Sequence, residues 1–171
     1  MKKQLYQLAY LFVLFFLHAA FLAVFSAESY IVPQFLFLFV IIIALRSRLA
    51  ESLWLAAAAG FLLEIYSGLF FGAHIFSLVL IALIVYLATR NLTVQDISPA
   101  AAALLVLAGT IVYALFTLGY QTVFVFLGLG VAEPISSFVS ASGVVTLVLN
   151  YLFFYPLRAV FIFFPKDEGP F

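Results

Sequence analysis

The sequence predicts an all-α integral membrane protein: a bundle of six transmembrane helices with both termini in the cytoplasm. Of its 171 residues, 68% are hydrophobic and only 8% are charged, whereas ordinary soluble domains carry roughly 25% charged residues. A water-soluble fold of this size could not bury so much apolar surface. The chain contains no cysteine, which excludes disulfides and thiolate metal sites, and its few charges exclude an extended nucleic-acid-binding surface.

Polar or turn-forming stretches divide the chain into six apolar segments, which we expect to form a single membrane domain over residues 1–171. The first segment is long enough to cross a hydrocarbon core of ~30 Å, which favours a membrane span over a cleaved signal peptide. The second is short, about 20 Å if helical, so flanking residues must extend it or it re-enters the membrane. The six expected spans are approximately residues 5–25, 33–45, 49–66, 73–89, 99–127 and 135–164.

The basic residues determine the expected orientation. If the N-terminus is cytoplasmic, every Lys and Arg lies on the cytoplasmic side, and the external loops hold Glu28 and Glu133 without a basic residue. This split follows the positive-inside rule. It supports six spans, because dropping one span would move some basic residues to the external side. The seven basic residues are Lys2, Lys3, Arg46, Arg48, Arg90, Arg158 and Lys166.

Glu64 lies within an apolar span, in a frame of small residues. An ionisable group at the centre of a span costs about 2.5–3.5 kcal/mol on insertion scales, so such a residue rarely lacks a role. Ala56 and Gly60 precede Glu64 at four-residue spacing and therefore share one helix face with it. Small side chains on this face would let the backbone of another helix approach closely.

The residues after Glu64 predict a tight external hairpin. Gly68 and Gly72 bracket the turn, and glycine permits backbone angles that other residues resist. His74 begins the next segment, so Glu64 and His74 could approach each other across the hairpin. Three interpretations remain open for Glu64. It could anchor the hairpin, by extending its side chain to the outer membrane interface or by bonding a backbone group. It could instead form a partner or ligand site, or take part in proton-coupled transport.

A second small-residue pattern lies in the first span. Ala19, Ala23 and Ala27 recur at four-residue spacing and predict a helix-packing seam. His18, just before this seam, could join Glu64 and His74 in a zinc site, because imidazole and carboxylate are common zinc ligands. These residues come from three spans without a ligand-spacing motif, so we expect no metal and no cofactor.

The polar inventory does not indicate an enzyme. No serine–histidine–aspartate set and no pair of aspartates is placed within the spans, and nothing supplies an oxyanion stabiliser. Polar residues in the fifth and sixth spans, including Thr110, Tyr113 and Asn150, are expected to serve interhelical packing.

One stretch of the sequence resembles a known family, that of the rod shape-determining protein MreD. The resemblance rests on a glycine, an acidic residue four positions later, a small-residue turn and a further glycine before the next span. Two further features are similar to those of the family: a proline before the short second segment, and a pair of arginines that separates this segment from the third. The family usually has aspartate where this chain has glutamate. The residues concerned are Gly60, Glu64, Ser67, Gly68, Gly72, His74, the stretch on to Tyr86, Pro33, Arg46 and Arg48.

The resemblance implies a non-enzymatic inner-membrane component of the bacterial cell-elongation machinery (the elongasome). Members work with MreC, MreB and the RodA–penicillin-binding-protein synthase to direct lateral peptidoglycan synthesis and cell shape. On this basis we expect a scaffold that binds an MreC-like single-span membrane protein. Its outward-facing groove would be shaped by Glu64, Ser67, Gly68, Gly72 and His74, and Glu64→Leu would weaken binding of the partner without impairing folding.

An alternative class fits the same span count. Substrate-binding membrane subunits of energy-coupling-factor vitamin transporters are also small six-span proteins with cytoplasmic ends. The seam at Ala19, Ala23 and Ala27 is similar to their coupling stripe, although here it lies toward the external end of the first span. Fold alone would not decide between the two classes.

Overall fold

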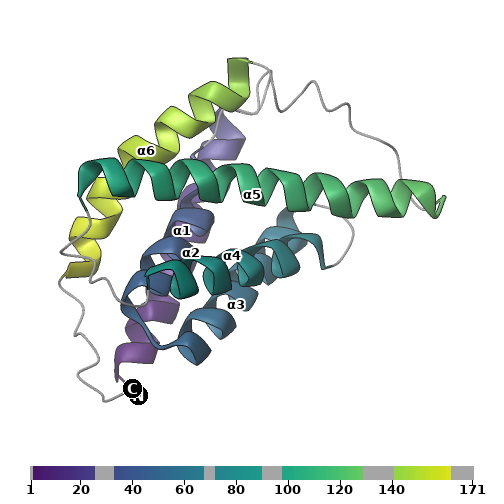
Figure 1. Ribbon diagram of the computed structural model, residues 1–171. Helices are drawn as coiled ribbons and strands as arrows, with labels where there is room; N and C mark the ends of the chain where they lie inside the picture. The colour runs from purple at the N-terminus through teal and green to yellow at the C-terminus, as the bar shows by residue number, and fades with distance from the viewer. Residues whose placement is uncertain (1, 26–32, 68–71, 90–97, 129–140, 163–171) are drawn as a thin grey trace.

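The computed structural model describes residues 2–25, 33–67, 72–89, 98–128 and 141–162, and these residues form six α-helices and no strand (Figure 1). The helices coincide closely with the six apolar segments expected from the sequence. The first part of the sixth segment, residues 135–140, lies outside the described residues. The helices are α1 (Lys2–Phe25), α2 (Phe35–Arg46), α3 (Leu49–Ser67), α4 (Ala73–Thr89), α5 (Pro99–Phe126) and α6 (Ala141–Ile162).

The shortest helix, α2, forms the core of the molecule. Every residue from Phe35 to Leu45 is buried, and three phenylalanines of this helix are almost completely enclosed. Helices α1, α3, α4 and α6 all pack against it. A helix that is hydrophobic on all sides requires such surroundings. At about 18 Å, α2 is too short to cross a bilayer by itself.

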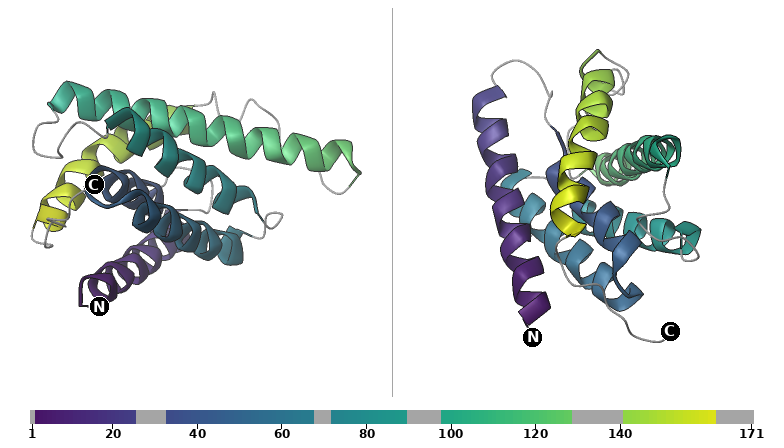
Figure 2. Two further views of the ribbon diagram at one scale, coloured as in Figure 1. Left: turned by 60° about the horizontal axis from the view of Figure 1, so that its bottom comes forward. Right: turned by 90° about the vertical axis from the view of Figure 1, so that its left-hand side faces the viewer.

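Helices α3 and α4 form a tightly packed hairpin, and Gly60 is the point of closest approach. The two helices lie side by side along their lengths (Figure 2). A Cβ atom at Gly60 would lie 2.4 Å from the Cα atom of Ile75 and 2.6 Å from its nitrogen. Any side chain at this position would therefore force the two backbones apart. The sequence-based expectation of a close approach on this face of α3 is confirmed at Gly60.

Helix α5 runs beside α4 and crosses α1 (Figures 1 and 2). It begins with a local cap, because the Ser98 side chain accepts a hydrogen bond from the Ala101 N–H at 3.2 Å and Pro99 occupies the first turn. In Figure 2 (right), α5 is seen nearly end-on while α1 runs up the picture, so the two helices cross steeply. Gly109 lets α5 contact α2, since a Cβ there would lie 3.0 Å from the Phe37 ring.

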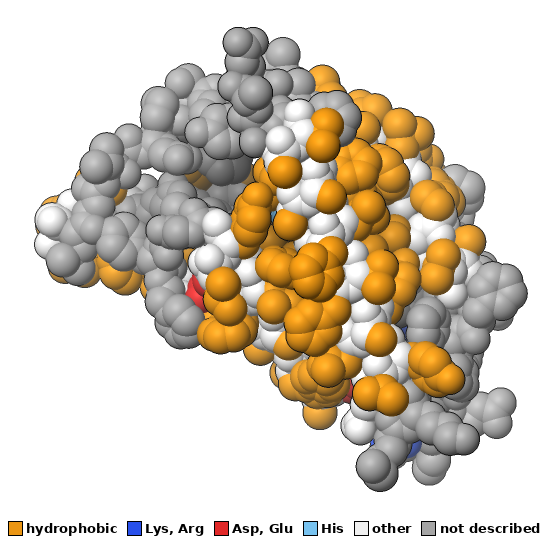
Figure 3. All heavy atoms as spheres, turned by 180° about the vertical axis from the view of Figure 1, so that it is seen from behind, with side chains coloured by type: hydrophobic (Ala, Val, Ile, Leu, Met, Phe, Trp, Pro, Cys, Tyr) orange, Lys and Arg blue, Asp and Glu red, His pale blue; other side chains and the backbone are white. Residues whose placement is uncertain are grey.

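The outer surface matches an apolar environment. Large hydrophobic side chains such as Leu104, Leu115 and Phe126 are exposed, and hydrophobic side chains dominate the face in Figure 3. Among the described residues, Gln4–Val24, Leu49–Tyr66 and Ala100–Phe126 are long and apolar enough to cross a membrane. The other three helices are apolar but shorter over their described lengths. These helices support the conclusion that the chain is a membrane protein. That it crosses the membrane six times, with both termini in the cytoplasm, remains a prediction from the sequence.

The close contact at Gly60 predicts the outcome of a pair of glycine substitutions. Gly60→Ala should destabilise the protein, because the new methyl group would overlap the backbone of Ile75. Gly119→Ala is the matched control, because a Cβ at this exposed position of α5 would meet no atom within 4 Å. The control should be neutral or slightly stabilising. Unfolding temperatures of the purified proteins in a mild detergent would test this; equal values for the two variants would contradict it.

Candidate functional site

The carboxylate of Glu64 caps the N-terminus of the neighbouring helix. Its Oε1 atom accepts hydrogen bonds from the backbone N–H groups of His74 at 2.9 Å and Ile75 at 3.1 Å. These are among the first N–H groups of α4, which have no partner within their own helix. Such groups are usually capped by a residue just before the helix. Here the acceptor comes from the neighbouring helix α3.

Two glycines make this remote cap possible. Gly60 lies one turn before Glu64 and brings α3 against the start of α4. Gly72 has a φ of 108°, a backbone angle that side chains with a Cβ rarely adopt. Its carbonyl accepts the N–H of Phe76 at 2.9 Å, which starts the first turn of α4. A Cβ at Gly72 would also lie 2.9 Å from the Tyr120 hydroxyl, so α5 packs closely over this turn.

The side chain of His74 ties the same turn to α5. Its Nδ1 atom lies 2.6 Å from the hydroxyl oxygen of Tyr113, within hydrogen-bond distance. The two rings stack with centroids 6.0 Å apart, and the Tyr113 ring also contacts Phe37 of α2. Glu64, His74 and Tyr113 therefore join three helices at one point.

This junction is closed to solvent. Glu64 is 5% exposed and His74 is 8% exposed, so these two side chains do not line an open groove. The Glu64 Oε2 and His74 Nε2 atoms are buried without a hydrogen-bond partner among the described residues. Within the described part of the chain, no three His, Asp or Glu side chains come together in a way that could hold a metal ion.

A second polar junction caps α2. The Oδ1 atom of Asn150, in α6, accepts the backbone N–H of Gln34 at 2.8 Å. Its Nδ2 atom donates to Gln34 Oε1 at 3.2 Å and lies 3.4 Å from the Thr110 hydroxyl of α5. On the other side, His18 Nδ1 lies 3.2 Å from the carbonyl oxygen of Pro33. Both short helices, α2 and α4, are thus capped by side chains of other helices.

Only some of the expected site residues come together in the structure. Gly60, Glu64, Gly72 and His74 come together as described above. Ser67 is the last residue of α3, but its side chain and Gly68 lie outside what the structure describes. The sequence did not reveal that Tyr113 meets His74 or that Asn150 bonds Gln34. The one signal for both was the placement of polar side chains in apolar spans.

The expected packing residues also differ from one another. Ala56 is completely buried in the core. Ala19 is half-buried and Ala23 is exposed, so the described helices leave the outer end of the α1 seam partly uncovered. Ala27 lies outside the described residues.

Two substitutions of Glu64 should show whether its side chain stabilises the protein as a hydrogen-bond acceptor or only by filling space. Glu64→Leu removes the acceptor for two buried N–H groups, so we expect a loss of about 2 kcal/mol of stability. This differs from the sequence-based expectation that folding would be unimpaired. Glu64→Gln keeps an oxygen acceptor at the same reach and should retain most of the stability. Detergent-solubilised variants would be compared by thermal unfolding, and a Leu variant as stable as the Gln variant would rule out capping.

Comparison with known proteins identifies the family. The family model for the rod shape-determining protein MreD matches residues 1–166. No curated protein and no solved structure matches the chain. The match begins before α1 and ends beyond α6, so it includes both capping junctions as well as the stretch from Gly60 to His74. This chain therefore belongs to the MreD family of rod shape-determining membrane proteins.

Proposed function

We propose that this protein is a non-enzymatic scaffold in the bacterial inner membrane that holds an MreC-like single-span membrane protein. Membership of the MreD family carries the role in rod shape determination. In the wider complex, MreB and the RodA–penicillin-binding-protein synthase would be its partners. Through them the scaffold would help to direct lateral peptidoglycan synthesis. The family match favours this proposal over the vitamin-transporter alternative.

The use of the buried polar side chains supports a scaffold. Glu64 and Asn150 bond the first N–H groups of other helices, and the His74 ring meets Tyr113. Thr110 and Thr117 donate to carbonyl oxygens within α5, at 2.8 and 2.9 Å. The bonds of Glu64, Asn150 and His74 fasten helices to one another, and those of the two threonines are satisfied within α5. A catalytic group, by contrast, needs access to a substrate.

We propose that the residues around Glu64 act indirectly on the partner. Because Glu64 and His74 are buried, they would hold the α3–α4 hairpin in shape rather than contact a second protein. The contact itself would be made by exposed apolar surface. The alanine seam of α1 suits this role, because Ala23 is exposed and small residues let two membrane helices approach closely. A single-span partner would lay its helix along this seam.

A bulky residue in the seam should weaken the complex. We expect Ala23→Trp to reduce the recovery of the MreC-like protein several-fold, because the indole would hold the partner helix away from α1. Val24→Trp is the matched control, since Val24 is 71% exposed and, as the next residue along, is rotated by about 100° around the axis of α1. Recovery would be measured by pull-down of the tagged protein from native membranes in a gentle detergent, with mass spectrometry.

The outcomes of this pull-down are distinct. Recovery of the partner with the wild-type protein and with Val24→Trp, but not with Ala23→Trp, would support both the scaffold and the seam. Equal recovery with both variants would exclude the seam and leave the scaffold intact. Recovery of paired ATPases or a bound vitamin-sized molecule with the wild-type protein, instead of a single-span partner, would overturn the scaffold in favour of a transporter subunit.

A further inference from the structure

We propose that one end of the molecule, where α1 begins and the chain turns from α2 into α3, binds the headgroup phosphate of an anionic phospholipid. We call this surface the basic end and define it by Arg46, Arg48 and the backbone of the first turn of α1, whose sequence includes Lys2 and Lys3. It is separate from the capping junctions and from the seam at Ala23. The inference concerns lipid and does not depend on the proposed protein partner.

The fold brings together the first turn of α1, the end of α2 and the turn before α3. Gln7 of α1 donates through Nε2 to the Ser47 hydroxyl at 3.5 Å, and both side chains are buried. Lys3 lies four residues before Gln7, on the same face of α1. Arg46 is the last residue of α2, and Arg48 directly precedes α3. The contact between Gln7 and Ser47 therefore places the first turn of α1 beside the turn that carries the two arginines.

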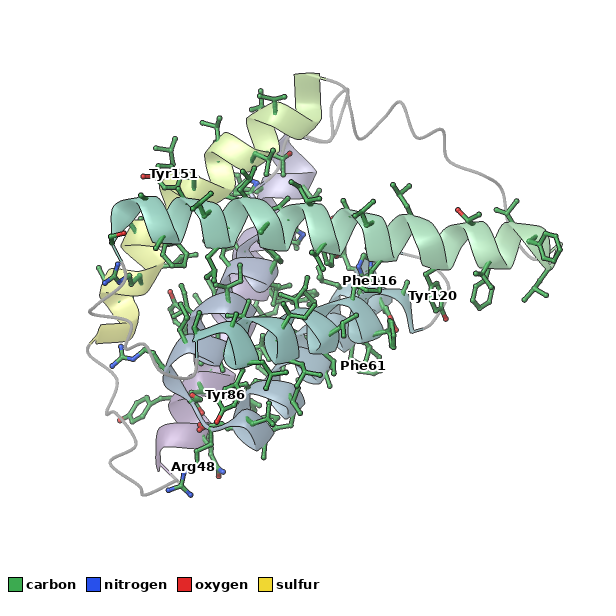
Figure 4. The ribbon with its side chains drawn as sticks, viewed as in Figure 1. Arg48, Phe61, Tyr86, Phe116, Tyr120 and Tyr151 are labelled. Atoms are coloured by element: carbon green, nitrogen blue, oxygen red, sulfur yellow. The ribbon has the colours of Figure 1, made fainter. Side chains whose placement is uncertain are left out.

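The surface views agree with this arrangement. Figure 4 shows Arg48 pointing outward at the end of the molecule where α1 begins. In Figure 3, which shows the opposite side, the basic side chains visible at the surface lie at this same end, next to a wide hydrophobic face. Arg48 is exposed, whereas Arg46 and Glu51 are half-buried and interact within the chain. Arg48 is thus the best placed of the described basic side chains to meet a ligand from outside.

Aromatic residues place the basic end at the level of lipid headgroups. Tyr6 of α1 is 57% exposed, and Trp54, the one tryptophan of the chain, is 39% exposed in α3. Tyr6 follows Lys2 and Lys3 by about one helical turn, and Trp54 lies within two turns of the start of α3, which Arg48 directly precedes. Tyr and Trp gather where hydrocarbon meets headgroups. The combination of arginine, lysine and interfacial aromatics above an apolar surface suits a phospholipid better than an acidic protein segment, which would not require the apolar neighbours.

The chemistry of the site favours an anionic headgroup. A guanidinium group, such as that of Arg48, can donate two parallel hydrogen bonds to one phosphate. Each Lys or Arg near an anionic leaflet adds a favourable contribution that salt screens. Glu51 is the acidic residue nearest in sequence, and it is already engaged within the chain. Phosphatidylglycerol, with a net negative headgroup, should therefore bind better than zwitterionic phosphatidylethanolamine.

The test adds defined lipids to the purified, full-length protein in a non-ionic detergent. We expect phosphatidylglycerol to raise the unfolding temperature and native mass spectrometry to detect bound lipid, with a smaller effect from phosphatidylethanolamine of the same acyl chains. Arg48→Gln should weaken phosphatidylglycerol binding about fivefold, without changing the unfolding temperature in detergent alone. Arg158→Gln, which removes a basic group from α6, is the matched control and should respond like the wild-type protein.

Each outcome decides the proposal. Loss of the phosphatidylglycerol effect in Arg48→Gln but not in Arg158→Gln, together with a weaker effect at high salt, would support the basic end as the site. Equal stabilisation by both lipids would show that only the acyl chains matter and would overturn it. An effect of phosphatidylglycerol that Arg48→Gln leaves unchanged would overturn it as well.

Discussion

Two helices of this protein begin in its interior, and the need to satisfy their first N–H groups constrains the rest of the structure. These groups are buried or half-buried, and an unsatisfied N–H in such surroundings costs free energy. The chain meets the need at α4 with Glu64 from α3 and at α2 with Asn150 from α6. Because each acceptor lies on a different helix from the N–H groups it serves, capping and helix packing are here one interaction. A helix that moved away would leave its neighbour's N-terminus without an acceptor.

Helix α5 connects the two capping junctions. Thr110 lies within hydrogen-bond distance of Asn150 in one junction, and Tyr113, about one turn further along, meets His74 in the other. The ring of Tyr113 also contacts the ring of Phe37, which belongs to the central helix α2. This arrangement explains why polar residues are retained in apolar helices where each costs free energy. They hold helices of different direction in fixed positions, as the scaffold role proposed above would require.

The positions of the helices were largely predictable from the sequence, but the site was only partly so. Apolar segments bounded by polar or glycine-containing stretches gave the six helices, and the spacing of Gly60 and Glu64 placed both residues on one face of α3. The sequence also indicated that His74 would approach Glu64. It did not indicate that the carboxylate bonds the backbone of His74 rather than the ring, nor that Tyr113 takes the ring. The first bond depends on how α3 packs against α4 and the second on how α5 packs against α4, and no local pattern encodes either arrangement.

The sequence by itself determined the class of protein, the helices and the family, because composition, apolar length and local motifs are properties of the chain before it folds. Tertiary structure decided what the individual polar residues do. Glu64 was open to interpretation as an anchor, a binding residue or a proton carrier, and the close approach at Gly60 brought it to the N-terminus of α4. The same holds for Asn150 and Gln34, which are 116 residues apart in sequence yet bond each other. Such contacts exist only once the helices have packed, because they join groups that no sequence spacing relates.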